Sequence, residues 1–148
     1  MQCSLLIYSE TNRPEQTTAI LGMQPSRVVE KGEPLHCSSQ PHSKRNGWFL
    51  VWECDIISEM DQTLQKLLKL CLEKKTALSS IQDAEVSIRC HVSSEYGQKG
   101  YELSKETVFA LAKMGVGLQI TIFFLWRRRI VRASLFVATR NTGYKQIG

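Results

Sequence analysis

The stretch GWFLVWECDI, residues 47–56, decides the fold, because it reads as one long strand that is apolar on most of both faces. Successive side chains of a strand point to opposite faces. One face carries Trp48, Leu50, Trp52 and Cys54, and the other carries Phe49, Val51 and Glu53. Since only the end of the second face is polar, the pattern predicts a central strand with both tryptophans in the interior.

The segments on either side of this strand carry alternating strand and helix patterns. We expect strands at 2–9, 26–33, 47–56, 84–95 and 117–126, and helices at 11–22, 58–83 and 104–115. In the fourth strand, Val86, Ile88, Cys90 and Val92 alternate with Ser87, Arg89, His91 and Ser93. This alternation predicts a strand with one buried and one wet face.

Capping residues set the expected helix ends. Asn12, Ser58 and Ser104 precede the three helical patterns and are good N-cap residues. Gly22 and Gly115 follow the first and last helices, where a glycine in the left-handed region ends a helix. The middle helix repeats leucines at three- and four-residue steps, which predicts one continuous amphipathic helix.

The resulting order is β-α-β-β-α-β-α-β. Its first six elements match a ferredoxin-like, split βαβ plan with two helices on one face of an antiparallel sheet, and a helix and a strand extend it. We therefore expect an α+β fold, with residues 1–126 as a single domain and 127–148 as a basic C-terminal extension. That extension reads either as disordered or as an aberrant terminus.

Composition favours a reduced, cytoplasmic protein. The chain of 148 residues can bury a core without disulfides or metals. No secretion signal is visible at the start, and no apolar run reaches the length of a membrane span. The cysteines are odd in number, contain no Cys-x-x-Cys pair and mostly fall in apolar patterns. They lie at Cys3, Cys37, Cys54, Cys71 and Cys90.

The positive charge of the chain resides in its C-terminal part. Residues 127–148 hold six arginines and lysines and no acid, whereas the other 126 residues hold 13 cations against 14 acids. The body is therefore nearly neutral, and a nucleic-acid-binding role would depend on the tail. Stacking of bases on Phe49 and the two tryptophans is the weaker alternative, because tryptophan commonly fills sheet cores.

An ordered set of motifs points to a family. LGMQPSRVVEKGE at 21–33, GWFLVWECD at 47–55, a leucine-rich helix, VSIRCHV at 86–92 and ELSKETVFALAKMGVGLQITIFF at 102–124 follow one another. Together they make residues 3–124 resemble the bacterial domain-of-unknown-function 4279 family. The resemblance implies a compact bacterial cytoplasmic domain and carries over no catalytic residue. Residues 127–148 depart from the family pattern.

The segment at 21–35, LGMQPSRVVEKGEPL, has a structural and a functional interpretation. Gly22, Pro25 and Gly32 are suited to ending a helix and turning the chain, which is the favoured reading. In the alternative, Arg27 and Lys31 project from a rigid turn and grip an acidic or phosphate-bearing partner. No nucleotide-binding glycine motif accompanies them.

Histidines and cysteines supply the remaining candidates. His36, Cys37 and His42, with Cys54 as a distant fourth ligand, could bind zinc, but a solvated loop is the favoured reading. Cys90 and His91 are adjacent on a strand, so they point to opposite faces and cannot form a nucleophile–base pair. We expect a core cysteine beside an exposed histidine.

The expected function is a non-enzymatic protein-interaction domain of the inhibitor or immunity type, which occludes a partner. We expect no catalytic centre, metal or cofactor. The carboxylates Glu53 and Asp55 at the end of a strand keep enzymatic activity as an alternative. Nucleic-acid binding through the basic tail is the alternative function. The candidate partner-binding residues are Arg27, Lys31, His36, His42, Arg89 and His91.

Overall fold

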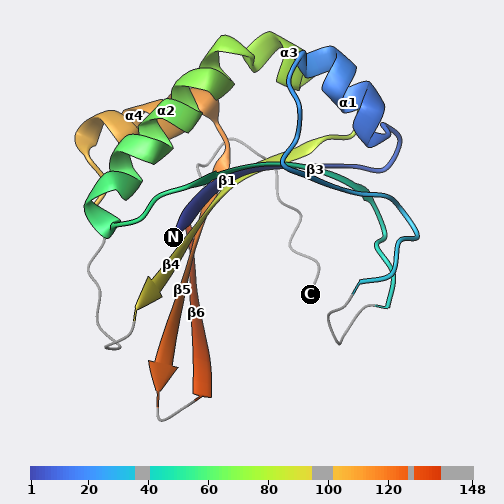
Figure 1. The fold of residues 1–148 in the computed structure, drawn as a ribbon. Helices are drawn as coiled ribbons and strands as arrows, with labels where there is room; N and C mark the ends of the chain where they lie inside the picture. Colours follow the sequence, from blue (N-terminus) through green and yellow to red (C-terminus); the bar gives the residue numbers. More distant parts are fainter. Residues whose placement is uncertain (36–40, 95–101, 127–128, 138–148) are drawn as a thin grey trace, which may run out of the picture.

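A sheet with all its described helices on one side makes up the fold (Figure 1). The computed structural model describes residues 1–35, 41–94, 102–126 and 129–137. The strands are β1 (Gln2–Ser9), β2 (Arg27–Val29), β3 (Asn46–Glu53), β4 (Glu85–Ser94), β5 (Gly117–Trp126) and β6 (Arg129–Val137). The helices are α1 (Pro14–Leu21), the 3-10 turn η1 (Ile57–Glu59), α2 (Met60–Glu73), α3 (Lys75–Ser80) and α4 (Lys105–Met114). The predicted α+β class is confirmed.

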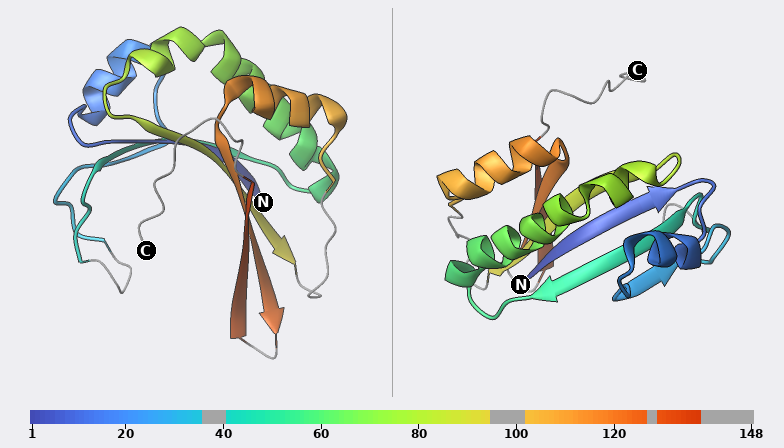
Figure 2. Two further views of the ribbon diagram at one scale, coloured as in Figure 1. Left: turned by 180° about the vertical axis from the view of Figure 1, so that it is seen from behind. Right: turned by 90° about the horizontal axis from the view of Figure 1, so that it is seen from above.

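The strands form one mixed sheet in the order β2-β3-β1-β4-β5-β6. The first strand of the chain, β1, lies in the interior of the sheet and pairs antiparallel with both β3 and β4. β2 pairs antiparallel with β3, β4 pairs parallel with β5, and β5 pairs antiparallel with β6. Viewed from above, α1 lies over the β2–β3 side, α2 runs along β1, and α4 lies toward β5 (Figure 2).

The main hydrophobic core lies between the helices and the side of the sheet that they cover, here the helix face. Alternate residues of the strands supply it, as the sequence predicted: Trp48 is 1% exposed, and Trp52 packs against the core while half-buried. The indole N–H of Trp48 donates a hydrogen bond to Thr18 Oγ1 at 3.0 Å. The helix layer contributes five fully buried side chains from α2: Met60, Leu64, Leu67, Leu68 and Cys71.

The opposite side of the sheet, here the lower face, carries a much smaller apolar cluster. Leu6, Val29 and Phe49 form it, and Tyr8 meets Phe49 edge to face at 5.4 Å. The ring of Phe49 extends across Gly47, where a Cβ atom would stand 2.5 Å from Phe49 Cζ. Glycine at this position therefore leaves room for the ring that closes the cluster.

Two predicted helix starts and the continuity of the middle helix were wrong. The predicted helix at 58–83 is divided into η1, α2 and α3, and the break between α2 and α3 falls at Lys74, whose φ of −96° and ψ of 11° depart from helical values. α2 begins at Met60 rather than after Ser58. Arg13, rather than Asn12, is the N-cap residue of α1, and its N–H donates to Gln16 Oε1 at 2.8 Å.

The last helix and both glycine stops agree with the sequence prediction. Ser104 is the N-cap of α4, and its hydroxyl accepts a hydrogen bond from the N–H of Thr107 at 3.3 Å. Gly22 and Gly115 end α1 and α4 with φ values of 64° and 69°, in the left-handed region where glycine is favoured.

An aspartate on α2 ties that helix to α4. Asp61 Oδ1 accepts hydrogen bonds from Thr107 Oγ1 at 2.7 Å and from the N–H of Ser104 at 3.2 Å. Asp61 Oδ2 accepts from Gln65 Nε2 at 2.9 Å. The start of α4 is therefore anchored on the first turn of α2.

The chain continues in regular structure after residue 126. Residues Arg129–Val137 form β6, which pairs with β5 from Leu118↔Val137 to Trp126↔Arg129. The predicted extension at 127–148 thus contributes a strand to the sheet, and the predicted domain end at 126 lies within a paired hairpin. The extension's other residues, 127–128 and 138–148, lie outside the described part of the chain.

Candidate functional site

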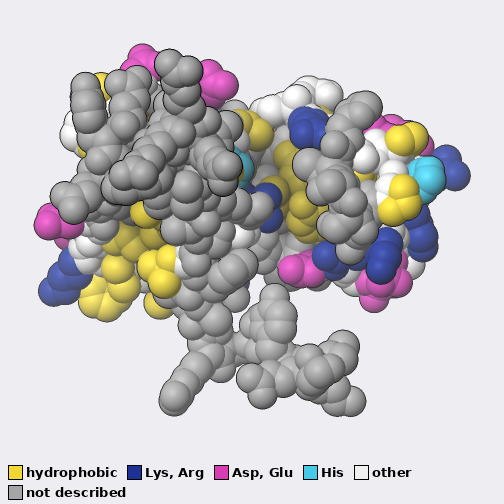
Figure 3. Space-filling model, turned by 90° about the horizontal axis from the view of Figure 1, so that it is seen from below, with side chains coloured by type: hydrophobic (Ala, Val, Ile, Leu, Met, Phe, Trp, Pro, Cys, Tyr) yellow, Lys and Arg dark blue, Asp and Glu magenta, His cyan; other side chains and the backbone are white. Residues whose placement is uncertain are grey.

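The lower face gathers polar side chains from neighbouring strands at one end of the sheet. Gln2 on β1 is paired with Glu53 on β3 and with His91 on β4, so all three side chains belong to the same face. Figure 3 shows the lower face with Lys or Arg, His and hydrophobic side chains close together around a hollow. This row of polar residues marks the best candidate site.

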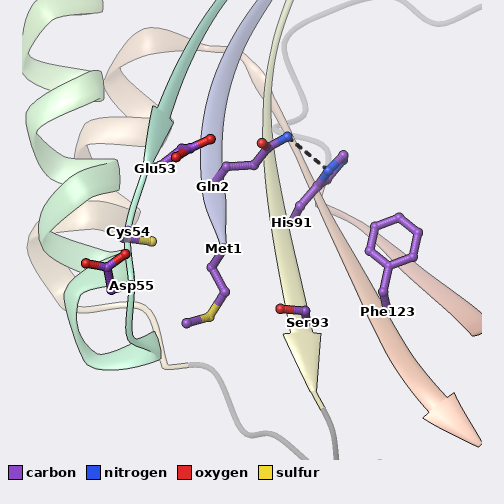
Figure 4. Close-up of a pocket in the computed structure, with 8 residues that line it drawn as sticks. All are labelled: Met1, Gln2, Glu53, Cys54, Asp55, His91, Ser93 and Phe123. Atoms are coloured by element: carbon purple, nitrogen blue, oxygen red, sulfur yellow. Dashed lines mark hydrogen bonds between the residues drawn. The ribbon is translucent and has the colours of Figure 1, made fainter.

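A pocket of about 350 Å³ lies at this end of the sheet (Figure 4). The lining residues are Met1, Gln2, Glu53, Cys54, Asp55, His91, Ser93 and Phe123. The side chain of Gln2 reaches toward His91, with Nε2 and Nδ1 3.2 Å apart. The ring of His91 also meets Phe123 edge to face at 5.5 Å, so both contacts fix its orientation.

The pocket can bind polar groups, but its cysteine is not an activated nucleophile. Burial raises the pKa of the Cys54 thiol, which keeps it protonated at neutral pH. Glu53 and Asp55 are exposed and can accept hydrogen bonds. Neither Trp48 nor Trp52 lines the pocket, and both pack in the core on the helix face.

A single arginine occupies the middle of the lower face. Arg89 is half-buried on β4, and its Nε donates to Gln119 Oε1 on β5 at 2.8 Å. Within the described residues, the only ion pair joins Arg45 and Glu85, at 2.6 Å. The guanidinium of Arg89 is therefore held in a fixed direction by an uncharged partner, and no described carboxylate forms an ion pair with it.

The remaining predicted residues are distributed over two places. Arg27 on β2 is exposed and is paired with Phe49, so it shares the lower face with Arg89 and His91. Lys31 and His42 are exposed in the hairpin segment beside β2 and β3, where His42 bridges to Pro34. His36 lies outside the described residues.

The zinc interpretation receives no support from the described residues. His42 precedes β3 and Cys54 follows it, so the length of the strand, about 24 Å, separates them. Cys37 lies outside the described part of the chain, in which no group of three or more His, Cys, Asp or Glu residues could hold a metal ion.

Cys90 and His91 point to opposite faces, as predicted: Cys90 is fully buried on the helix face, whereas His91 is half-buried rather than exposed. Sequence reasoning missed Gln2, Gln119 and Phe123. Each sits at an alternating position of a correctly predicted strand, so its face follows from the pattern, but its neighbours on the adjacent strands could have been found only with the strand register.

The comparisons with known proteins agree with the resemblance seen in the sequence. Neither the curated proteins nor the solved structures contain a match to the chain. Within the described residues, no helix has the length and apolar character to cross a membrane. The model of the domain-of-unknown-function family DUF4279 matches residues 1–125 of the 148. The chain therefore belongs to the DUF4279 family.

Proposed function

We propose that this chain is a non-enzymatic protein-interaction domain that binds an acidic partner protein through its lower face. The observation that carries the proposal is Arg89, a half-buried guanidinium oriented by Gln119 on a surface that also holds an apolar cluster. In this proposal the domain acts in the bacterial cytoplasm as an inhibitor or immunity-type protein. It would occlude the functional surface of its partner.

The chemistry of the lower face supports a carboxylate as the group recognised. Because Nε of Arg89 is bound to Gln119, its terminal amino groups are available to a planar anion such as a carboxylate. Arg27 stands three strands away on the same face, about 14 Å across the sheet. Two cations at this spacing match a surface that carries several acidic side chains.

The size of the lower face fits occlusion of a partner. Six strands at about 4.8 Å spacing span roughly 24 Å across the sheet, and the eight residues of β3 span about 24 Å along it, while the edge strand β2 has only three residues. A stable protein complex buries about 800 Å² on each partner. The accessible area of the lower face is of the same order, because projecting side chains add to the area of the flat sheet. Leu6 and Phe49 would supply apolar contact beside the charged groups.

The test compares two charge-removing variants that differ in the face they affect. Arg89→Ala should weaken binding to the acidic partner at least tenfold, measured by calorimetry with the partner purified after capture from the native host. Lys66→Ala, an exposed residue of α2, removes the same charge from the helix side and should leave affinity unchanged.

Two results would overturn the proposal. The first is that Arg89→Ala binds the partner as tightly as wild type does, while the variant keeps the melting temperature of wild type. The second is turnover of a substrate that depends on His91 or Glu53, since these residues line the pocket at the end of the same face.

The second candidate function is nucleic-acid binding through residues 127–148, favoured by six cations without an acid in that segment. Deleting the whole segment would remove β6 as well as the charge. The sharper test is therefore Arg140→Gln with Lys145→Gln, which leaves β6 intact. Loss of salt-dependent binding to DNA or RNA would support the tail, and unchanged binding would reject its role.

We also infer that the first part of the sheet follows a ferredoxin-like plan. The order β2-β3-β1-β4 supports this, because β3 lies between β1 and β2, and β1 lies between β3 and β4. Each helical connection then joins two strands that run in the same direction on either side of a third. In this reading α4, β5 and β6 are additions to the ferredoxin-like unit.

A further inference from the structure

Two buried cysteines face each other across the centre of the sheet. Cys3 on β1 and Cys90 on β4 are directly opposite in the antiparallel register. Both are 0% exposed, and their sulfur atoms lie 3.5 Å apart on the helix face. The two thiols are therefore in contact with each other.

The backbone geometry suits a covalent bond between them. Directly opposed residues of antiparallel strands have Cα atoms about 4.5 or 5.5 Å apart, and both values lie in the range that a disulfide spans. A disulfide bond is about 2.05 Å long, so each sulfur must move by only about 0.7 Å from the 3.5 Å separation. Side-chain rotation can supply most of this movement.

We propose that Cys3 and Cys90 form an oxidative modification site, at which a hydroperoxide converts the two thiols into a cross-strand disulfide. In the first step the Cys3 thiolate attacks the peroxide, and the sulfenic acid of Cys3 forms with release of water or alcohol. In the second step the Cys90 sulfur attacks this sulfenic acid, the S–S bond forms and one water leaves. The peroxide is reduced, and the two thiols are oxidised by two electrons in total.

The two thiols share a hydrogen bond in which either sulfur can be the donor. The hydrogen bond with Cys90 lowers the pKa of Cys3, although burial opposes this effect. The same hydrogen bond, together with burial, raises the pKa of Cys90. These directions favour Cys3 as the attacking thiolate and Cys90 as the resolving thiol.

Access to the pair requires the end of β1 to open, because both sulfurs are fully buried on the helix face, on the other side of the sheet from the lower-face pocket. Gln2 and His91, the chain neighbours of Cys3 and Cys90, line that pocket, so the two cysteine side chains point away from it. Gln2 is also the last paired residue of β1 in both of its ladders. Ladder ends open more readily than sheet centres, so the opening of one residue pair brings peroxide to Cys3.

The test maps disulfides in the full chain after oxidation. The reduced protein is treated with hydrogen peroxide, the remaining thiols are alkylated in denaturant, and proteolytic peptides are analysed by mass spectrometry. We expect one linked pair of peptides, joining Cys3 to Cys90, that disappears after treatment with a phosphine reductant. Cys71 should remain alkylatable, because burial raises its pKa to about 12 and it lies on α2.

Matched variants separate this pair from other cysteines. Cys3→Ala and Cys90→Ala should each abolish the linked peptides, whereas Cys54→Ala and Cys37→Ala should retain them. Because the first two substitutions lie in the core, the wild-type peptide map provides a measurement that does not depend on their folding. The proposal would be overturned if Cys3 and Cys90 remained alkylatable under conditions that oxidise Cys37. A disulfide that joins another pair of cysteines would also overturn it.

A second readout is the stability of the oxidised wild type. The bond would join residues 87 positions apart, and closing so long a loop restricts the unfolded chain strongly. The oxidised protein should melt at least about 5 °C higher than the reduced protein. An unchanged melting temperature in protein that contains the linked peptides would indicate strain and exclude a native-like disulfide.

Discussion

The two faces of the sheet differ in composition although the same strands build them. On β3, Trp48 is buried in the main core and contacts α1, while its neighbour Phe49 belongs to a cluster of three buried residues among those described. On β4, Cys90 is fully buried, while its neighbours Arg89 and His91 are half-buried and polar. Alternation along each strand thus separates a stabilising face from a face that can bind.

This difference teaches where mutations should affect folding and where they should affect recognition. Apolar burial supplies most of the stability of a domain, at about 25 cal/mol per Å². Among the described residues, the helix face holds most of the buried apolar side chains, so its substitutions should be costly. The lower face should tolerate polar substitutions with small changes in the free energy of unfolding.

The largest expected effect is that of Trp48→Ala on the helix face. Removing the indole leaves a cavity in a site that is 1% exposed and should lower the free energy of unfolding by about 4 kcal/mol. Urea denaturation followed by circular dichroism measures this loss. The matched control is Trp52→Ala, on the same strand and face but half-buried, which should cost clearly less. Equal losses would break the comparison.

Asp61→Asn should have the next largest effect, because it weakens the hydrogen bonds that tie α4 to α2. Burial acts to raise the pKa of Asp61, but the hydrogen bonds from Thr107, Ser104 and Gln65 outweigh burial and hold that pKa below its ordinary value. Bonds to a charged acceptor are strong, so we expect a loss of about 2 kcal/mol at pH 7.

The pH dependence of this loss has a definite sign. Because the pKa of Asp61 is lower in the folded state, its contribution is present above the unfolded pKa of about 3.9 and is lost as pH falls through the folded pKa. The stability difference between wild type and Asp61→Asn should therefore shrink below about pH 4. A difference that stays constant down to pH 2 would exclude the carboxylate as its cause.

Thr18→Val sharpens the comparison by removing a polar contact from the helix face. The substitution keeps the shape of the side chain but leaves the buried indole N–H of Trp48 without its acceptor. An unsatisfied buried donor costs about 1–2 kcal/mol. Chemical denaturation should show this loss in wild type but not in a Trp48→Phe background, where no indole is present.

The smallest expected effect lies on the lower face, at the ion pair between Arg45 and Glu85. Both side chains are more than a third exposed, and Arg45 also stands over the Tyr8 ring at 5.0 Å. A double-mutant cycle with Arg45→Gln and Glu85→Gln should give a coupling of about 0.5 kcal/mol or less, declining with added salt. Coupling above 2 kcal/mol would contradict the view that this face contributes little stability.

The strands and their faces could be predicted from the sequence because alternation is a local pattern. The ends of α2 and α3 could not, since Lys74 interrupts a pattern whose apolar residues remain buried on both sides of it. β6 was missed because its sequence was interpreted through its charge rather than its strand pattern. The pocket could not be predicted, because it depends on the register that places Glu53, Gln2 and His91 side by side.

The central position of β1 has a consequence for folding kinetics. Both partners of β1 come later in the chain: β3 starts at Asn46, and β4 starts at Glu85. The first strand must therefore wait until two distant segments have been brought to it, which makes its contacts long-range in sequence. Refolding should consequently be slow for a chain of this size, on a timescale of milliseconds to seconds, with β1 protected from hydrogen exchange only when the whole sheet has assembled.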